Sequence, residues 1–235
     1  MQNLLHGTLA FFTFVIPAVL IMLGLRVFTK IPDELFRKLL HFILLAVYGV
    51  ILVAFKTWQS AVIFSLLVIA LFYPVFTLAG KIPGFSRFVN ERKGGEFKNS
   101  LILALSMMAF CIFVCWGLLD DKLLVLACIY AWGVGDGFAA LVGKRFGKHK
   151  IKLKCADGKK SLEGSATMFV CSVLSVMCVL LIRGGLGIGA CLFISLAAAA
   201  ACTFAELCSK GGIDTVTCPL AAMLVILPLT IILGG

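Results

Sequence analysis

Long hydrophobic stretches alternate along the chain with short polar breaks. Each stretch is close to the roughly 20 residues that an α-helix needs to cross a bilayer. None shows the alternation of apolar and polar positions over about ten residues that is typical of a membrane β-strand. The pattern therefore predicts an all-α, polytopic integral membrane protein. The eight predicted membrane helices cover about residues 8–28, 36–55, 58–79, 99–118, 122–143, 161–182, 186–206 and 216–233.

The composition supports this prediction. Hydrophobic residues make up 62% of the 235 residues, compared with roughly 45–50% in a soluble domain, so they cannot all be hidden in a core. At about 20 residues per helix plus connections, no room is left for a separate soluble domain. We expect residues 1–235 to form a single transmembrane catalytic domain built as one bundle. No Lys or Arg precedes the first stretch, which favours a helix over a signal peptide.

The basic residues predict the orientation of the helices. Of the 21 Lys and Arg residues, only Lys56, Lys122 and Arg183 fall at the loops that follow even-numbered helices. Positive charge marks the cytoplasmic side, so both termini are expected on the non-cytoplasmic side. The net charge of +10 fits attraction to anionic lipid headgroups, and it also suits a site for a nucleotide or lipid phosphate. The basic loops lack interleaved aromatic residues, so nucleic acid is not an expected partner.

Four polar clusters lie on the predicted cytoplasmic side, where polar residues at helix ends are informative because they are costly in a membrane. In RKLLH, the side chains of Arg37, Lys38 and His41 are three or four residues apart and share one helical face. They either reach toward headgroups or contribute to a site. The segment ERKGGEFKNS, residues 91–100, could present backbone amides to an anion, although charge runs of this kind are typical of solvated loops.

The third cluster contains a lone carboxylate, Asp136, among Gly133, Gly135 and Gly137. It lies roughly 10 Å from the predicted helix end at Gly143, and glycines at this depth permit close backbone approach or local unwinding beside a wet cavity. Asp136 is therefore a candidate magnesium ligand or acid/base group, the alternative being an ion pair that locks helices together. The spacing fits neither a Walker A loop nor a dinucleotide-binding fingerprint.

The segment GKKSLEGS, residues 158–165, continues this third cluster. Lys159 and Lys160 precede a helix predicted to begin at Ser161. A helix N-terminus with a capping hydroxyl and adjacent lysines suits phosphate oxygens. Glu163, in the first turn, is compatible with the helix dipole and also with a magnesium ion.

The fourth cluster, residues 205–219, brings two more acids. Glu206 ends an Ala-rich helix, and Asp214 stands at the start of the last helix, where on its own it could be an N-cap. Together with Asp136 and Glu163, these two acids make four carboxylates on one predicted membrane face, beside many cations. That is the electrostatic composition of a magnesium–nucleotide site.

These segments occur in an order that resembles the polyprenol and lipid-alcohol kinase family, which includes phytol kinases, dolichol kinases and CTP-dependent diacylglycerol kinases. The matching segments are RKLLH, GDGFAALVGKRFGK, KSLEGS, and finally AEL with DTVTCP. The resemblance covers about residues 35–220, and its most specific part is the pairing of GDG with KSLEGS. The family is distantly similar to the CDP-diacylglycerol synthases, or phosphatidate cytidylyltransferases.

The resemblance implies Mg²⁺-dependent transfer of a phosphoryl group, typically from CTP, to the hydroxyl of a polyprenol, phytol-like alcohol or diacylglycerol at the cytoplasmic face. Where the family commonly has Asp-Asn, this chain has Asp214 and Thr215, so the nucleotide preference is open. A phosphatidate cytidylyltransferase and a transporter without chemistry are the alternatives. Nothing in the sequence indicates a homo-oligomer. The candidate residues are Asp136, Glu206 and His41 for acid/base catalysis, Lys160, Ser161, Gly137, Lys144, Arg37 and Lys38 for nucleotide or phosphate binding, and Asp136, Glu163 and Asp214 for the metal.

Overall fold

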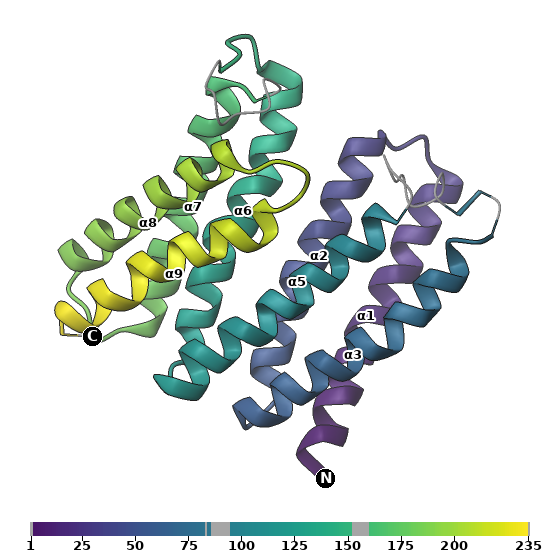
Figure 1. The fold of residues 1–235 in the computed structure, drawn as a ribbon, viewed down its shortest axis with the longest axis horizontal. Coiled ribbons are helices and arrows are strands. Elements are labelled where there is room, and N and C mark those ends of the chain that lie inside the picture. The colour runs from purple at the N-terminus through teal and green to yellow at the C-terminus, as the bar shows by residue number, and fades with distance from the viewer. Residues whose placement is uncertain (1, 83, 86–94, 152–159, 235) are drawn as a thin grey trace. The chain divides into compact units, whose positions relative to one another are not determined.

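The computed structural model describes residues 2–82, 84–85, 95–151 and 160–234. Within these ranges eight helices are long and apolar enough to cross a membrane, as predicted, and β-structure is confined to one isolated bridge between Lys150 and Ser161. The elements are α1 (Gln2–Phe28), α2 (Asp33–Ala54), α3 (Trp58–Ala79), α5 (Glu96–Cys111) with the π-helical turn η1 (Ile112–Leu118), α6 (Lys122–Phe146), α7 (Leu162–Arg183), α8 (Ile188–Cys208) and α9 (Asp214–Ile232) (Figure 1).

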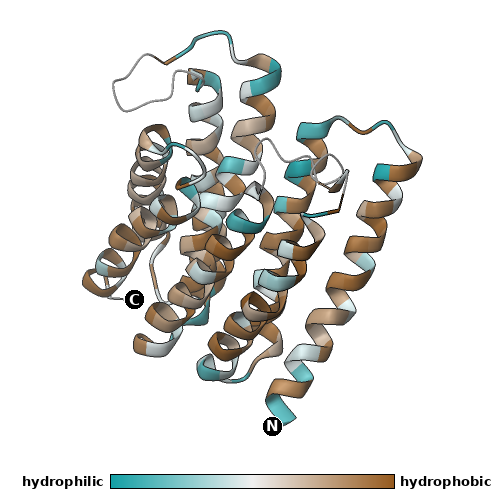
Figure 2. Ribbon diagram, turned by 45° about the vertical axis from the view of Figure 1, so that its right-hand side comes forward, coloured by the Kyte–Doolittle hydropathy of each residue, from teal (hydrophilic) through white to brown (hydrophobic). Residues whose placement is uncertain are grey.

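Hydropathy locates these helices well but misplaces some of their ends. α1 begins at Gln2 and α6 continues to Phe146, each beyond its predicted apolar stretch. Helical hydrogen bonding does not stop where the side chains become polar, because intrahelical bonds satisfy the backbone both in lipid and at the membrane surface. Figure 2 shows the result: hydrophobic residues occupy the middles of the helices, and hydrophilic residues gather toward their ends and connections.

The chain divides into two compact units, Met1–Leu118 and Leu119–Gly235. In the first unit, Phe64 of α3 packs edge-on against Phe11 of α1, with 5.0 Å between the ring centroids. The ring centroid of Phe55 is also 5.0 Å from that of Phe64. Asn3 accepts a hydrogen bond from the backbone N–H of Lys56 and thereby fastens the start of α1 to the end of α2. The expectation of one catalytic domain stays a prediction, as does the side of the membrane on which each terminus lies.

The second unit is built around α6, which contacts α7, α8 and α9. Glycines allow α6 and α7 to approach closely: a Cβ on Gly135 would lie 2.5 Å from Ser172 Oγ, and one on Gly143 would lie 3.4 Å from Gly164 Cα. Ser172 Oγ also donates to the carbonyl of Ala131 at 2.5 Å. Small residues and hydroxyl groups thus bring the two backbones together. The α6 glycines were predicted to permit either close backbone approach or local unwinding. The structure shows close approach, because α6 is helical throughout.

Candidate functional site

Two of the other predicted carboxylates lie within electrostatic range of Glu206 in the second unit. Asp136 of α6 and Asp214 of α9 both interact electrostatically with Glu206 near the end of α8. Asp136 follows the buried Gly135 and precedes the buried Gly137, ten residues before α6 ends. Because three different helices supply the three acids, their grouping depends on the packing of the unit.

A partly buried ion pair stands next to these acids. Lys160 Nζ lies 2.7 Å from Glu206 Oε1, and the two side chains are 17% and 15% exposed. Lys160 also donates to the backbone carbonyl of Glu206 and, at 3.3 Å, to that of Ser209. The last carbonyls of a helix have no intrahelical partner and carry partial negative charge. Lys160 therefore binds the end of α8 as well as the Glu206 carboxylate.

Asp214 connects α9 to α6. Ile213 occupies the N-cap position of α9, so the alternative that Asp214 is simply the N-cap is wrong, and the carboxylate belongs to the first helical turn. The indole N–H of Trp132, on α6, donates to Asp214 Oδ2 at 3.4 Å. Trp132 is 4% exposed. It lies one turn before Asp136 on the same face of α6. The sequence reasoning missed Trp132 because a tryptophan in an apolar helix gives no separate signal.

A second link joins α8 to α9. Ser209 and Thr217 place their hydroxyl oxygens 2.6 Å apart. Each hydroxyl also has a backbone acceptor one turn earlier, the carbonyl of Ala205 at 2.7 Å for Ser209 and that of Ile213 at 3.3 Å for Thr217, so either one can be the donor in the hydroxyl pair. The end of α8, the start of α9 and the residue before α7 are thus tied into one polar network through Lys160, Ser209 and Thr217.

Ser161 begins α7 as predicted. Its side chain is the N-cap and accepts from the backbone N–H of Gly164 at 3.2 Å. Glu163, in the first turn, is bound to the preceding loop: the His149 ring nitrogen Nδ1 lies 2.7 Å from its Oε1, and the His149 backbone N–H donates to the same oxygen at 3.2 Å. The bridge between Lys150 and Ser161 holds this loop beside the helix start. His149 is a second residue that the sequence reasoning missed.

The described carboxylates that lie near one another in this unit are too few to form a complete magnesium site without a nucleotide. Among the residues that the structure describes, no group of three or more His, Cys, Asp or Glu side chains could hold a metal ion alone. Magnesium–nucleotide sites, however, commonly use one or two carboxylates and complete the coordination with phosphates and water. Asp136 and Asp214 fit that arrangement. Glu163 fits it less well because its carboxylate already accepts hydrogen bonds from the loop.

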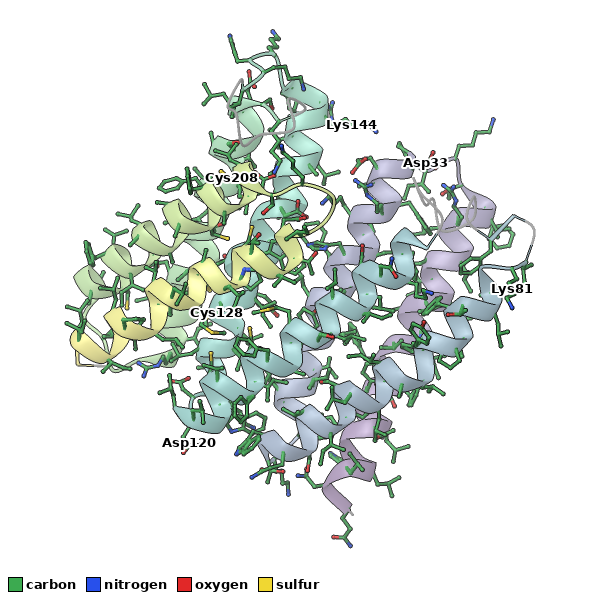
Figure 3. The ribbon with its side chains drawn as sticks, viewed as in Figure 1. Asp33, Lys81, Asp120, Cys128, Lys144 and Cys208 are labelled. Carbon is green, nitrogen blue, oxygen red and sulfur yellow. The ribbon has the colours of Figure 1, made fainter. Side chains whose placement is uncertain are left out.

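The remaining candidate residues are distributed over both units. Arg37 forms an ion pair with Glu34, Lys38 is only 7% exposed, and His41 packs edge-on against Phe42; all belong to α2 of the first unit, so their participation in a site with Asp136 stays a prediction. Lys144 is exposed in the last turn of α6, at the opposite end of this helix from Asp120 (Figure 3). Lys159 and residues 91–94 of the segment 91–100 lie outside the described residues.

Comparison with known proteins agrees with these features. The model of the cytidylyltransferase family matches residues 3–210. The chain belongs to this family. A relative named phytol kinase, from Synechocystis sp., is 36% identical over 97 residues, which are 41% of this chain and 40% of the relative. These matches confirm the resemblance to lipid-alcohol kinases. No solved structure matches the chain.

Proposed function

We propose that the protein is a lipid-alcohol kinase that transfers a phosphoryl group from a nucleoside triphosphate, CTP in the first instance, to the hydroxyl of a membrane alcohol such as phytol or a polyprenol. The similarity to a phytol kinase supports the acceptor class. The observation that carries the proposal is the partly buried pair of Lys160 and Glu206, within electrostatic range of Asp136 and Asp214. Phosphoryl transfer needs little covalent chemistry from the protein and relies on such positioned charges.

Each group has a proposed task in this reaction. Lys160 and the N-terminal turn of α7 at Ser161 would bind phosphate oxygens, because both present positive charge. Asp136 and Asp214 would hold Mg²⁺, which when bound to a triphosphate neutralises its oxygens. Glu163 would hold the loop at His149 in place beside the helix start. We propose that the site faces the cytoplasm, where nucleoside triphosphates are available and where the basic loops are predicted to lie.

A nucleotidyl transfer is the second candidate, because the matched family is described as cytidylyltransferases. The same charges would serve it, but a lipid phosphate would attack the α-phosphorus and pyrophosphate would leave. The two reactions therefore differ in the bond that breaks and in the label that the lipid acquires.

The test uses the purified full chain in detergent with phytol, a polyprenol, diacylglycerol or phosphatidate, and with CTP labelled on either the α- or the γ-phosphate. A kinase transfers the γ-label to an alcohol and releases CDP. A cytidylyltransferase transfers the α-label to phosphatidate and releases pyrophosphate. Replacing CTP by ATP, GTP or UTP then measures the nucleotide preference that Thr215 leaves open. Absence of label transfer to every lipid would refute both candidates.

A further inference from the structure

We infer that the Lys160–Glu206 ion pair is an internal substitute for a nucleotide phosphate: nucleotide binding opens the pair, and only then is Glu206 free to accept the proton of the lipid hydroxyl. This inference rests on the proposed kinase function and adds to it an order of substrate binding and a choice of proton acceptor. It follows from the number of hydrogen-bond partners around one ammonium group.

A lysine ammonium has three N–H donors. Lys160 has three acceptors within reach, namely Glu206 Oε1 and the backbone carbonyls of Glu206 and Ser209. The Glu206 carbonyl is in the last turn of α8 and the Ser209 carbonyl belongs to the residue that follows the helix, so both are held by the backbone, whereas the carboxylate can leave by rotating its side chain. A phosphate oxygen that binds Lys160 therefore takes the position of the Glu206 carboxylate. Both are oxygen anions that accept short, charge-assisted hydrogen bonds, so the exchange preserves the interaction that Lys160 makes.

The release of Glu206 has a consequence because of its neighbours. Asp136 and Asp214 already interact with it electrostatically, and Lys160 is the described cation that contacts it directly. Once Lys160 turns to a phosphate, Glu206 loses this cation while the negative charges of Asp136 and Asp214 stay within electrostatic range and repel it. That repulsion is relieved by a cation that arrives with the nucleotide or by a proton. Without nucleotide, Glu206 stays bound to Lys160 and does not act as a base.

The proton transfer fits the position of the pair. The phosphate held by Lys160 lies where Glu206 was, so the released carboxylate is next to the transferring group. The hydroxyl oxygen of the lipid forms a bond to the γ-phosphorus while the bond from that phosphorus to the β–γ bridging oxygen breaks with its electron pair. The hydroxyl proton moves to Glu206 and then to water. The nucleoside diphosphate departs, and Lys160 binds Glu206 again.

Binding of CDP and of a non-hydrolysable CTP analogue to the full chain in detergent tests the exchange by calorimetry. Glu206→Gln keeps the volume and removes the charge that competes for Lys160, so we expect nucleotide to bind several-fold more tightly while turnover falls by about 10²-fold or more, as for loss of a general base. Lys160→Met should weaken nucleotide binding. Asp33→Asn is the matched control: it removes one carboxylate charge from an exposed ion pair with Arg26, and should change neither quantity.

Equal or weaker nucleotide binding by Glu206→Gln would overturn the exchange, and full turnover by that variant would overturn the proton-acceptor role. The order of binding is measured on the wild-type protein, so it does not depend on the folding of a variant. Product-inhibition patterns should show nucleotide binding before the lipid alcohol; random order would contradict the inference. Failure of the kinase proposal is distinguishable, because the wild type would then form no lipid phosphate.

Discussion

Two partly buried ion pairs stand at opposite ends of α7, and they are equally buried but have different surroundings. At the end of the helix, Arg183 Nε lies 2.5 Å from Asp121 Oδ2, with side chains 16% and 17% exposed. Before its start, Lys160 and Glu206 are 17% and 15% exposed. Burial of a charged pair therefore does not separate a structural from a functional role in this unit.

The surroundings do separate them. Asp121 is the N-cap of α6 and accepts from the backbone N–H groups of Leu123 and Leu124, so both of its oxygens are used in starting one helix and holding the end of another. Glu206 has two further carboxylates within electrostatic range. A concentration of like charge is costly, and proteins retain it mainly where a ligand or a reaction needs it. We therefore propose that the first pair serves stability and the second serves the chemistry.

The largest effect is expected from Asp136→Asn. The substitution keeps the shape of the side chain and removes a charge that a magnesium–nucleotide complex would need, so turnover should fall by about 10²–10³-fold, the range for one lost electrostatic contact at a reacting group. Thermal unfolding in detergent should stay close to that of the wild type. Near-wild-type turnover would remove Asp136 from the site and leave it as a helix-packing carboxylate.

The structural pair should respond in the opposite way. Asp121→Asn leaves Arg183 without its carboxylate and weakens the cap of α6, so stability should fall by about 3 kcal/mol, with a lower melting temperature and little change in turnover per folded molecule. The double substitution Asp121→Leu with Arg183→Leu should recover part of that stability, because removing both charges leaves neither one buried alone.

The matched double change at the other end of α7, Lys160→Met with Glu206→Met, should keep the fold and lose activity. Loss of activity in both doubles would erase the distinction.

Trp132 offers a finer test because it contacts Asp214 of the proposed catalytic cluster, as Glu206 does electrostatically, but carries no charge. Trp132→Phe removes the N–H that contacts Asp214 and keeps an aromatic ring, so we expect turnover to fall by about tenfold, equivalent to a hydrogen bond to a charged group. In an Asp214→Asn background the same substitution should add much less. Trp116→Phe, in the first unit and 5% exposed, is the control for loss of a buried indole. Equal losses in both backgrounds would mean that Trp132 acts only through packing.

The eight helices could be predicted from sequence because the bilayer imposes a length and an apolar composition on each one. The acids were predictable as candidates for the same reason: Asp136 is conspicuous in an apolar stretch. Their partners were not predictable. Lys160 and Glu206 are 46 residues apart, and Trp132 and Asp214 are 82 apart, so the first contact is decided by how α7 packs against α8 and the second by how α6 packs against α9. His149 lies in a basic loop and has no distinguishing sequence signal. Its contact with Glu163 depends on this part of the loop turning back onto the start of α7.

The smallest effect is expected at Glu163. The sequence predicts a metal ligand there, and in the structure its carboxylate accepts hydrogen bonds from His149 in the preceding loop. If the carboxylate mainly holds His149, then His149→Ala and Glu163→Gln should remove the same interaction and lower turnover by similar, modest factors. The pair is largely exposed at His149, where the side chain is 77% accessible, so only a small change in stability is expected for each. The double variant should resemble either single one in a double-mutant cycle. A loss of turnover in Glu163→Gln that exceeds the His149→Ala loss by 10²-fold would restore the metal role, because only the carboxylate could coordinate the ion.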